Sequence, residues 1–281
     1  MSAAVVDSHL HFWDLSLYRR TDWLEDKPSL LKNFLPHDVK PEFDRCGVDL
    51  GIVVEAAKEF DSSNLWWLDL ARECAYLGAV VAGCHLEQKN LADWLDRYGA
   101  YREFVGVRAT PRGIPAEWPD NIEARRALSE LSRRDLSLDL LLHYPEFYGV
   151  EPLAAEFPEL RIIVNHCGHI PLDRASRAAW RAALEPLSRF SNIYVKYSSL
   201  LMNSQAAMPE EELTSHVSFL FDSFGPERMI WGSNWPVELL WGSYEESWDL
   251  SHRCLPGLSE SETEGVFGGN ALRAYRIPVG R

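Results

Sequence analysis

Short apolar runs alternate with longer amphipathic stretches along most of the chain. The runs are rich in Val, Ile and Leu and have the length of strands. Runs that are apolar without a gap are typical of parallel strands buried on both faces. We expect strands at residues 5–11, 51–56, 80–86, 104–108, 136–143, 161–166, 192–198 and 228–233.

Helical patterns follow most of these runs. Gly47 ends a short one, Ser62 or Ser63 caps the next, and Pro186 breaks a later one. We expect helices at 41–48, 62–74, 91–98, 121–131, 149–157, 174–190 and 209–221, and a final helical pair from the capping box at Ser259. Eight strands that alternate with helices predict the α/β class and a (β/α)8 TIM barrel, here as a single domain over residues 1–281. The alternative is an open doubly wound sheet, but no Gly-x-Gly-x-x-Gly follows the first strand.

Charge and composition limit the partners and the compartment. The net charge of -14 disfavours nucleic acid and anionic membranes. No apolar run is long enough for a spanning helix, and the first four residues do not resemble a secretory signal. The five cysteines are widely spaced and odd in number, which indicates reduced thiols in the cytoplasm. We expect a small-molecule substrate, anionic or polyhydroxylated, and leave a homodimer open.

Polar residues gather where the expected strands end. In a TIM barrel these carboxyl ends form the active site. His9 and His11, two residues apart, project from the same face of the first strand. Such a pair can hold a metal, bind an anion or pass protons. The other strand ends supply Glu55, His85, Arg108, His143, His166, His169, Lys196, Tyr197, Ser198 and Asn234.

Five segments carry a family resemblance. They are residues 6–13, 104–108, 164–168, 194–198 and 230–237, and the stretch 267–271 agrees with them. Together they resemble the amidohydrolase superfamily. The chain is similar to its amidohydrolase 2 branch, which holds fuconolactonases, rhamnonolactonases and pyrone-dicarboxylate lactonases. The resemblance spans nearly the whole chain and implies hydrolysis of a lactone or related cyclic ester at the mouth of the barrel.

The resemblance also implies roles for particular residues. His9, His11 and His166 match the family's catalytic histidines, and Asn234 stands where the family has a carboxylate. An amide cannot act as a general base and is a poor metal ligand. We therefore expect no required cofactor. If zinc binds, its ligands would come from His9, His11, His143 and His166.

Several residues keep two interpretations. Glu55 is either the general base or an ion-pair partner, and Lys196 either takes part in the chemistry or pairs inside the barrel. Arg108 is expected to hold a substrate anion. The remaining candidates for substrate binding are His143, Trp13, Trp235 and Tyr197. Because of Asn234, a decarboxylase or other lyase on the same fold stays open, as does a catalytically altered binding relative.

Overall fold

Eight parallel strands form one sheet whose order follows the sequence from β1 to β8. The computed structural model describes residues 3–17, 22–56, 60–109, 121–206 and 208–278. The strands are β1 (Val6–Leu10), β2 (Leu50–Val54), β3 (Leu77–Gly83), β4 (Phe104–Ala109), β5 (Ser137–Leu140), β6 (Ile162–Val164), β7 (Ile193–Tyr197) and β8 (Met229–Trp231).

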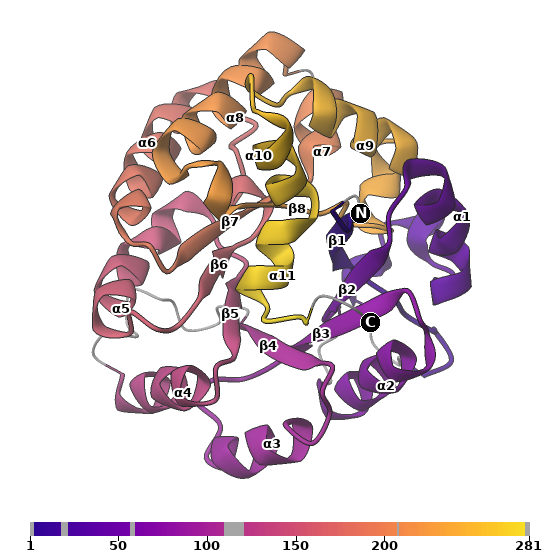
Figure 1. The fold of residues 1–281 in the computed structure, drawn as a ribbon, viewed down its shortest axis with the longest axis vertical. Helices are drawn as coiled ribbons and strands as arrows, with labels where there is room; N and C mark the ends of the chain where they lie inside the picture. Colours follow the sequence, from indigo (N-terminus) through magenta and orange to yellow (C-terminus); the bar gives the residue numbers. More distant parts are fainter. Residues whose placement is uncertain (1–2, 18–21, 57–59, 110–120, 207, 279–281) are drawn as a thin grey trace.

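Helices surround this sheet (Figure 1). They are α1 (Pro36–Cys46), α2 (Phe60–Glu73), α3 (Leu91–Tyr98), α4 (Ile122–Arg133), α5 (Val150–Glu156), α6 (Arg177–Leu184), α7 (Leu200–Gln205), α8 (Glu210–Phe224), α9 (Tyr244–Arg253), α10 (Glu260–Glu264) and α11 (Asn270–Ala274). The predicted TIM barrel and single domain are confirmed. Among the described residues, no helix is both long and apolar enough to cross a membrane.

The strands are buried on both faces. Ile52 and Val54 pack in the interior cluster of the barrel, whereas Val53 between them packs in the outer layer with the helices. This alternation is the reason why the sequence shows continuous apolar runs. The last strand returns to the first through two backbone hydrogen bonds, from His11 N–H to Trp235 O at 2.8 Å and from Asn234 N–H to His9 O at 2.9 Å.

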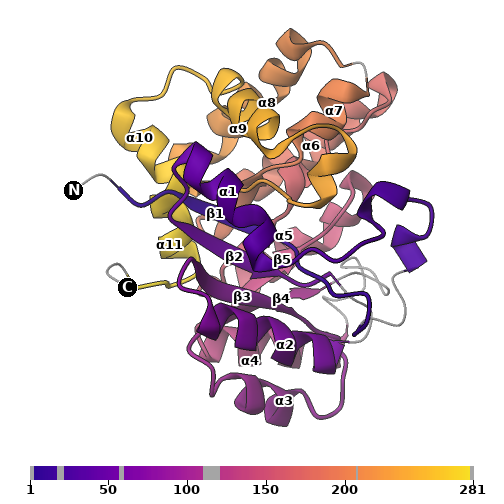
Figure 2. The same cartoon turned by 90° about the vertical axis from the view of Figure 1, so that its right-hand side faces the viewer.

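The two ends of the barrel differ. α11 lies across the centre of the ring in Figure 1, and Ala271, Ala274 and Tyr275 join the interior core. It therefore closes the end where the strands begin. In Figure 2 the indigo turns after β1 lie at the opposite end, where the strands finish. These turns are the 3-10 helices Asp22–Leu24 and Pro28–Leu30.

Several predicted boundaries were wrong. Strand β5 ends at Leu140, and His143 caps the 3-10 helix Tyr144–Gly149. Helix α1 begins at Pro36, because proline suits a first turn and Asp38 accepts a hydrogen bond from the Leu35 N–H.

One further helix prediction needs correction, and two helices were missed. Helix α2 begins at Phe60, so Ser62 and Ser63 lie inside it and do not cap it. Helices α7 and α9 were not predicted from the sequence. The capping box of Ser243 and Glu246 at the start of α9 is a signal that could have found that helix.

Candidate active site

A cavity of about 450 Å³ opens at the carboxyl ends of the strands. Its size is that of a small-molecule site. The segment after β1 contributes Trp23 to its wall. The described lining residues are His11, Trp23, Glu55, Ala56, Arg108, Leu141, His166, His169, Ser199, Met202, Asn234, Val237 and Trp241.

Lys196 fixes the proton on His9. Its ammonium donates to Asp139 Oδ2 at 2.9 Å, to Ser8 O at 2.8 Å and to His9 Nδ1 at 3.1 Å. All three ammonium protons then have acceptors. Because Nδ1 of His9 accepts, the proton of the neutral ring must lie on Nε2.

His11 has the opposite arrangement. Its Nδ1 donates to Val54 O at 2.9 Å, so its Nε2 carries a lone pair. The two Nε2 atoms of His9 and His11 lie 3.2 Å apart, which allows His9 to donate to His11. Burial lowers the pKa of His11 to about 3 and holds the pKa of His9 well below its usual range. The pair is therefore neutral and shares one internal hydrogen bond.

This donor set does not fit a zinc ion. A metal between the two rings needs a lone pair on both Nε2 atoms, but Lys196 places a proton on that of His9. Asn234 supplies an amide and no charge. Across the described residues, no group of three or more His, Cys, Asp or Glu side chains could hold a metal.

His166 lies at the start of a 3-10 turn after β6. Its Nδ1 lies 2.9 Å from Ser198 Oγ and 3.3 Å from Ser199 Oγ, while its ring packs 4.4 Å from that of His9. Among the described residues, the hydrogen bonds of the His166 ring all involve Nδ1, and the ring lines the cavity with Nε2 available. His169 differs, because its Nδ1 donates to the backbone carbonyl of Leu142 at 2.9 Å. Burial lowers the pKa of His169 to about 4.

Asn234 connects the histidines to Ser199. Its Oδ1 lies 3.2 Å from His11 Nε2, and its Nδ2 donates to Ser199 Oγ at 2.7 Å. The His11 nitrogen and the amide oxygen are both acceptors here. Because His11 Nε2 already accepts from His9 Nε2, the amide oxygen is the acceptor that a water molecule at this wall can use.

Arg108 and Glu55 form a buried ion pair in the cavity wall. Arg108 Nε donates to Glu55 Oε1 at 2.7 Å, and its Nη2 donates to the Glu55 carbonyl at 2.5 Å. The remaining Nη1 lies 3.4 Å from His9 Nε2. Since the lining histidines with lowered pKa are neutral, the charges of the described lining residues cancel.

Six predicted catalytic and substrate-binding residues are not among those that line the cavity: His9, described above, and five others. Lys196 is fully buried behind His9, and Tyr197 donates to Ser251 O in the outer layer. Trp13 and Trp235 both pack on Phe34. Strand β5 ends at Leu140, three residues before His143. Of the histidine rings at the site, that of His143 contacts the ring of His169, at 4.4 Å.

Sequence reasoning missed four residues of this network. Asp139 lies within β5 and pairs with Lys196, and Asp7 within β1 accepts from the N–H groups of His9 and Ser233. An acidic residue inside an apolar run was a usable signal for both. Ser199 and Glu238 follow β7 and β8, and their places depend on loop conformation.

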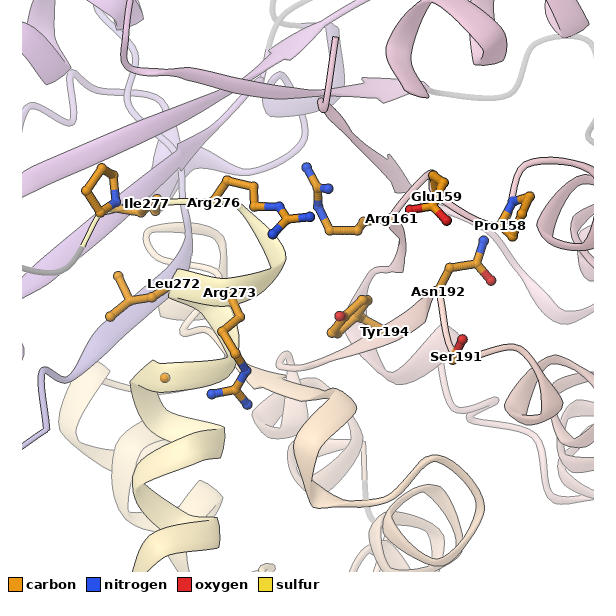
Figure 3. A pocket seen from close by; sticks show the side chains of 12 residues that line it. Pro158, Glu159, Arg161, Ser191, Asn192, Tyr194, Leu272, Arg273, Arg276 and Ile277 are labelled. Carbon is orange, nitrogen blue, oxygen red and sulfur yellow. The ribbon is translucent and has the colours of Figure 1, made fainter. Parts of the chain in front are cut away.

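A second hollow lies at the opposite end of the barrel (Figure 3). It measures about 680 Å³ and is lined by residues before β6 and β7 and by α11. Arg161 there pairs with Asp135 and donates to Ala274 O, and Arg276 pairs with the same Asp135 at 3.3 Å. These arginines therefore hold the C-terminal segment against the barrel.

Comparison with known proteins agrees with this geometry. The family model described as Amidohydrolase matches residues 6–277. The chain belongs to the amidohydrolase family. Two relatives of this amidohydrolase are named L-fucono-1,5-lactonase. The one from Burkholderia ambifaria is 26% identical, over 97% of this chain and 95% of the relative, and the one from Burkholderia multivorans is 28% identical, over 99% and 98%.

A solved relative has nearly the same fold. The crystal structure of an amidohydrolase from Burkholderia multivorans with bound HEPES is 27% identical, with a TM-score of 0.89, over 98% of this chain and all of that one. A second crystal form of that relative contains zinc, at 26% identity and a TM-score of 0.88, with the same coverage of both chains.

Proposed function

We propose that this amidohydrolase hydrolyses a lactone, a cyclic ester of a polyhydroxylated acid. The observation that carries the proposal is the neutral cavity. Its arginine is paired with Glu55, and its buried histidines carry no charge. An uncharged ring suits such a site, whereas a carboxylate substrate needs a cation that is not already neutralised. The two lactonase relatives support the same substrate class.

His166 is the proposed acid–base residue. Both ring nitrogens of His9 and of His11 are engaged by other protein groups. The serine hydroxyls at His166 Nδ1 can donate or accept, so this ring can carry its proton on either nitrogen. His166 Nε2 would take a proton from the attacking water and return it to the leaving ring oxygen.

The other residues hold the reactants. Arg108 Nη1, beside His9, would donate to the carbonyl oxygen as negative charge develops there. Asn234 Oδ1 would accept from the water and orient it, and His11 Nε2 would hold His9 in place by accepting its hydrogen bond. Glu55 would keep Arg108 in position. The proposed reaction uses no metal, in line with the donor set of His9 and Asn234.

The test is a product measurement on the purified chain with L-fucono-1,5-lactone and with a carboxylated phenol. We expect one proton released per lactone opened and no carbon dioxide from the phenol. Carbon dioxide evolution with proton uptake would favour the lyase. Saturable ligand binding without turnover of either compound would favour a binding protein.

A further inference from the structure

Glu238 is a buried carboxyl that the proposed reaction does not yet use. It lies in the 3-10 helix Val237–Leu240, four residues after Asn234, and is 2% exposed. Its Oε1 accepts from the Leu201 N–H at 2.7 Å, at the start of α7. In the described structure its Oε2 has no hydrogen-bond partner. A buried carboxyl oxygen without a donor is costly, so a structural cap does not account for the whole side chain.

Ser199 connects this carboxyl to the site. It lies beside the carboxyl without a hydrogen bond to it: Leu201, two residues after Ser199, donates to Glu238 Oε1, and Asn234, which donates to Ser199, accepts from the Glu238 N–H at 3.1 Å. The same hydroxyl accepts from Asn234 Nδ2 at 2.7 Å and lies 3.3 Å from His166 Nδ1. A serine hydroxyl has one proton to donate and can accept two. If that proton goes to Glu238, the two acceptor positions remain for Asn234 and His166.

We propose that Glu238, acting through Ser199, is a positioning residue that sets the proton of His166 on Nδ1 and presents Nε2 as the base. The inference rests on the proposed lactone hydrolysis. When His166 takes a proton at Nε2, the chain from Nδ1 through Ser199 ends on a carboxylate that stabilises the imidazolium. No bond forms or breaks within this chain. Glu238 thus supplies the negative charge that the amide of Asn234 lacks.

Ionisation of Glu238 then controls the arrangement. Burial raises the pKa of Glu238 to about 8. The groups that face it in the described structure are the N–H groups of Leu201 and Met202, the Ser199 hydroxyl and the Cys167 thiol. Burial raises the pKa of that thiol to about 12, so it stays neutral. The active arrangement therefore becomes more populated as the pH rises towards and past 8.

The variant Glu238→Gln distinguishes the positioning of His166 from a structural role of Glu238 in capping α7. Glutamine keeps an oxygen for the Leu201 N–H but presents a donor to Ser199, which reverses the proposed hydrogen bond. We expect kcat for lactone opening to fall at least about tenfold with KM and Tm nearly unchanged. The rise of kcat from pH 6.5 to 9 in the wild type should disappear. Glu262→Gln, which alters a carboxylate in the exposed capping box of α10, should leave activity unchanged.

Ser199→Ala completes a double-mutant cycle and leaves the cap of α7 intact. We expect Glu238→Gln to cause no further loss of kcat in the Ser199→Ala background, because both changes break the same series of hydrogen bonds between His166 and Glu238. Wild-type kcat and an unchanged pH profile in Glu238→Gln would overturn the inference. So would losses that multiply in the double variant. If the wild type opens no lactone, the proposed function fails instead, which keeps the two failures distinguishable.

Discussion

The tautomer of each histidine at the site follows from the hydrogen-bond partner of its Nδ1 atom. His9 accepts from an ammonium, while His11 and His169 donate to backbone carbonyls, so their protons are fixed. His166 meets only hydroxyls and can change. Of these four histidines, His166 can therefore both take and return a proton. The proton on His9 Nε2 is the feature that disfavours metal binding.

Metal removal tests this assignment of protons. After exhaustive chelation and dialysis, we expect lactone hydrolysis to stay within about twofold of the untreated rate, because no proposed step needs a Lewis acid. Elemental analysis of the untreated protein should find zinc well below one per chain. Activity that is lost on chelation and returns with added zinc would contradict the proton on His9.

At the level of elements, three strands are each followed by a site residue with the same unusual backbone conformation. The residues His166, Ser199 and Asn234 follow β6, β7 and β8, and all have positive φ, between 52° and 62°. Asparagine and histidine adopt this conformation more readily than serine does. Such backbone strain persists where the surrounding structure holds it, and at Asn234 the hydrogen bond from its N–H to His9 O does so.

Gly232→Ala tests the close approach of β8 to β1. A Cβ at Gly232 would lie 2.8 Å from His9 Cβ and 3.0 Å from His9 N. We expect the strands to separate, with a loss of about 1–3 kcal/mol in the free energy of unfolding and a lower kcat. Urea unfolding and lactone assays measure the two effects. Gly257→Ala, with no atom within 4 Å of the added Cβ, is the matched control and should change neither. Equal behaviour of the two variants would contradict the argument.

The strand-end rule predicted part of the site. His11, Glu55, Arg108, His166 and Asn234 line the cavity, as their places after apolar runs indicated. The strand-end rule could not place residues whose position depends on where a strand ends. His143 looked like a strand end, but β5 ends at Leu140 and His143 caps the 3-10 helix that follows.

Glu238 shows a second limit of sequence reasoning. It approaches Ser199 only because the chain after β8 folds as a 3-10 helix against α7. No pattern in the linear sequence gives that contact between loops after two different strands. The eight strands were predictable, in contrast, because burial on both faces leaves a clear apolar signal.

At the scale of the whole molecule, the core contains many titratable groups in their neutral form. Five histidines have lowered pKa values, namely His9, His11, His166, His169 and His216. Two carboxyls, Asp7 and Glu238, have raised pKa values and act in the opposite direction. The histidines outnumber them, so acid should destabilise the fold before the surface carboxylates titrate.

Acid unfolding tests this balance. Burial lowers the pKa of His169 to about 4 from 6.5, so the unfolded chain binds a proton that the folded chain does not. Stability is then complete above pH 6.5 and falls towards pH 4, by about 1.4 kcal/mol per pH unit for such a group. We expect Tm to fall over this range, with a shallower slope in His169→Gln. A flat Tm in the wild type would contradict the neutral core.

The proposed function depends on His166 as the acid–base residue that opens the lactone. The most direct measurement is acid release from L-fucono-1,5-lactone by the wild type and by His166→Ala under the same conditions, with circular dichroism to compare the folds. We expect rapid release by the wild type and a loss of about 10²–10⁴-fold in the folded variant. Wild-type rates in His166→Ala would contradict it.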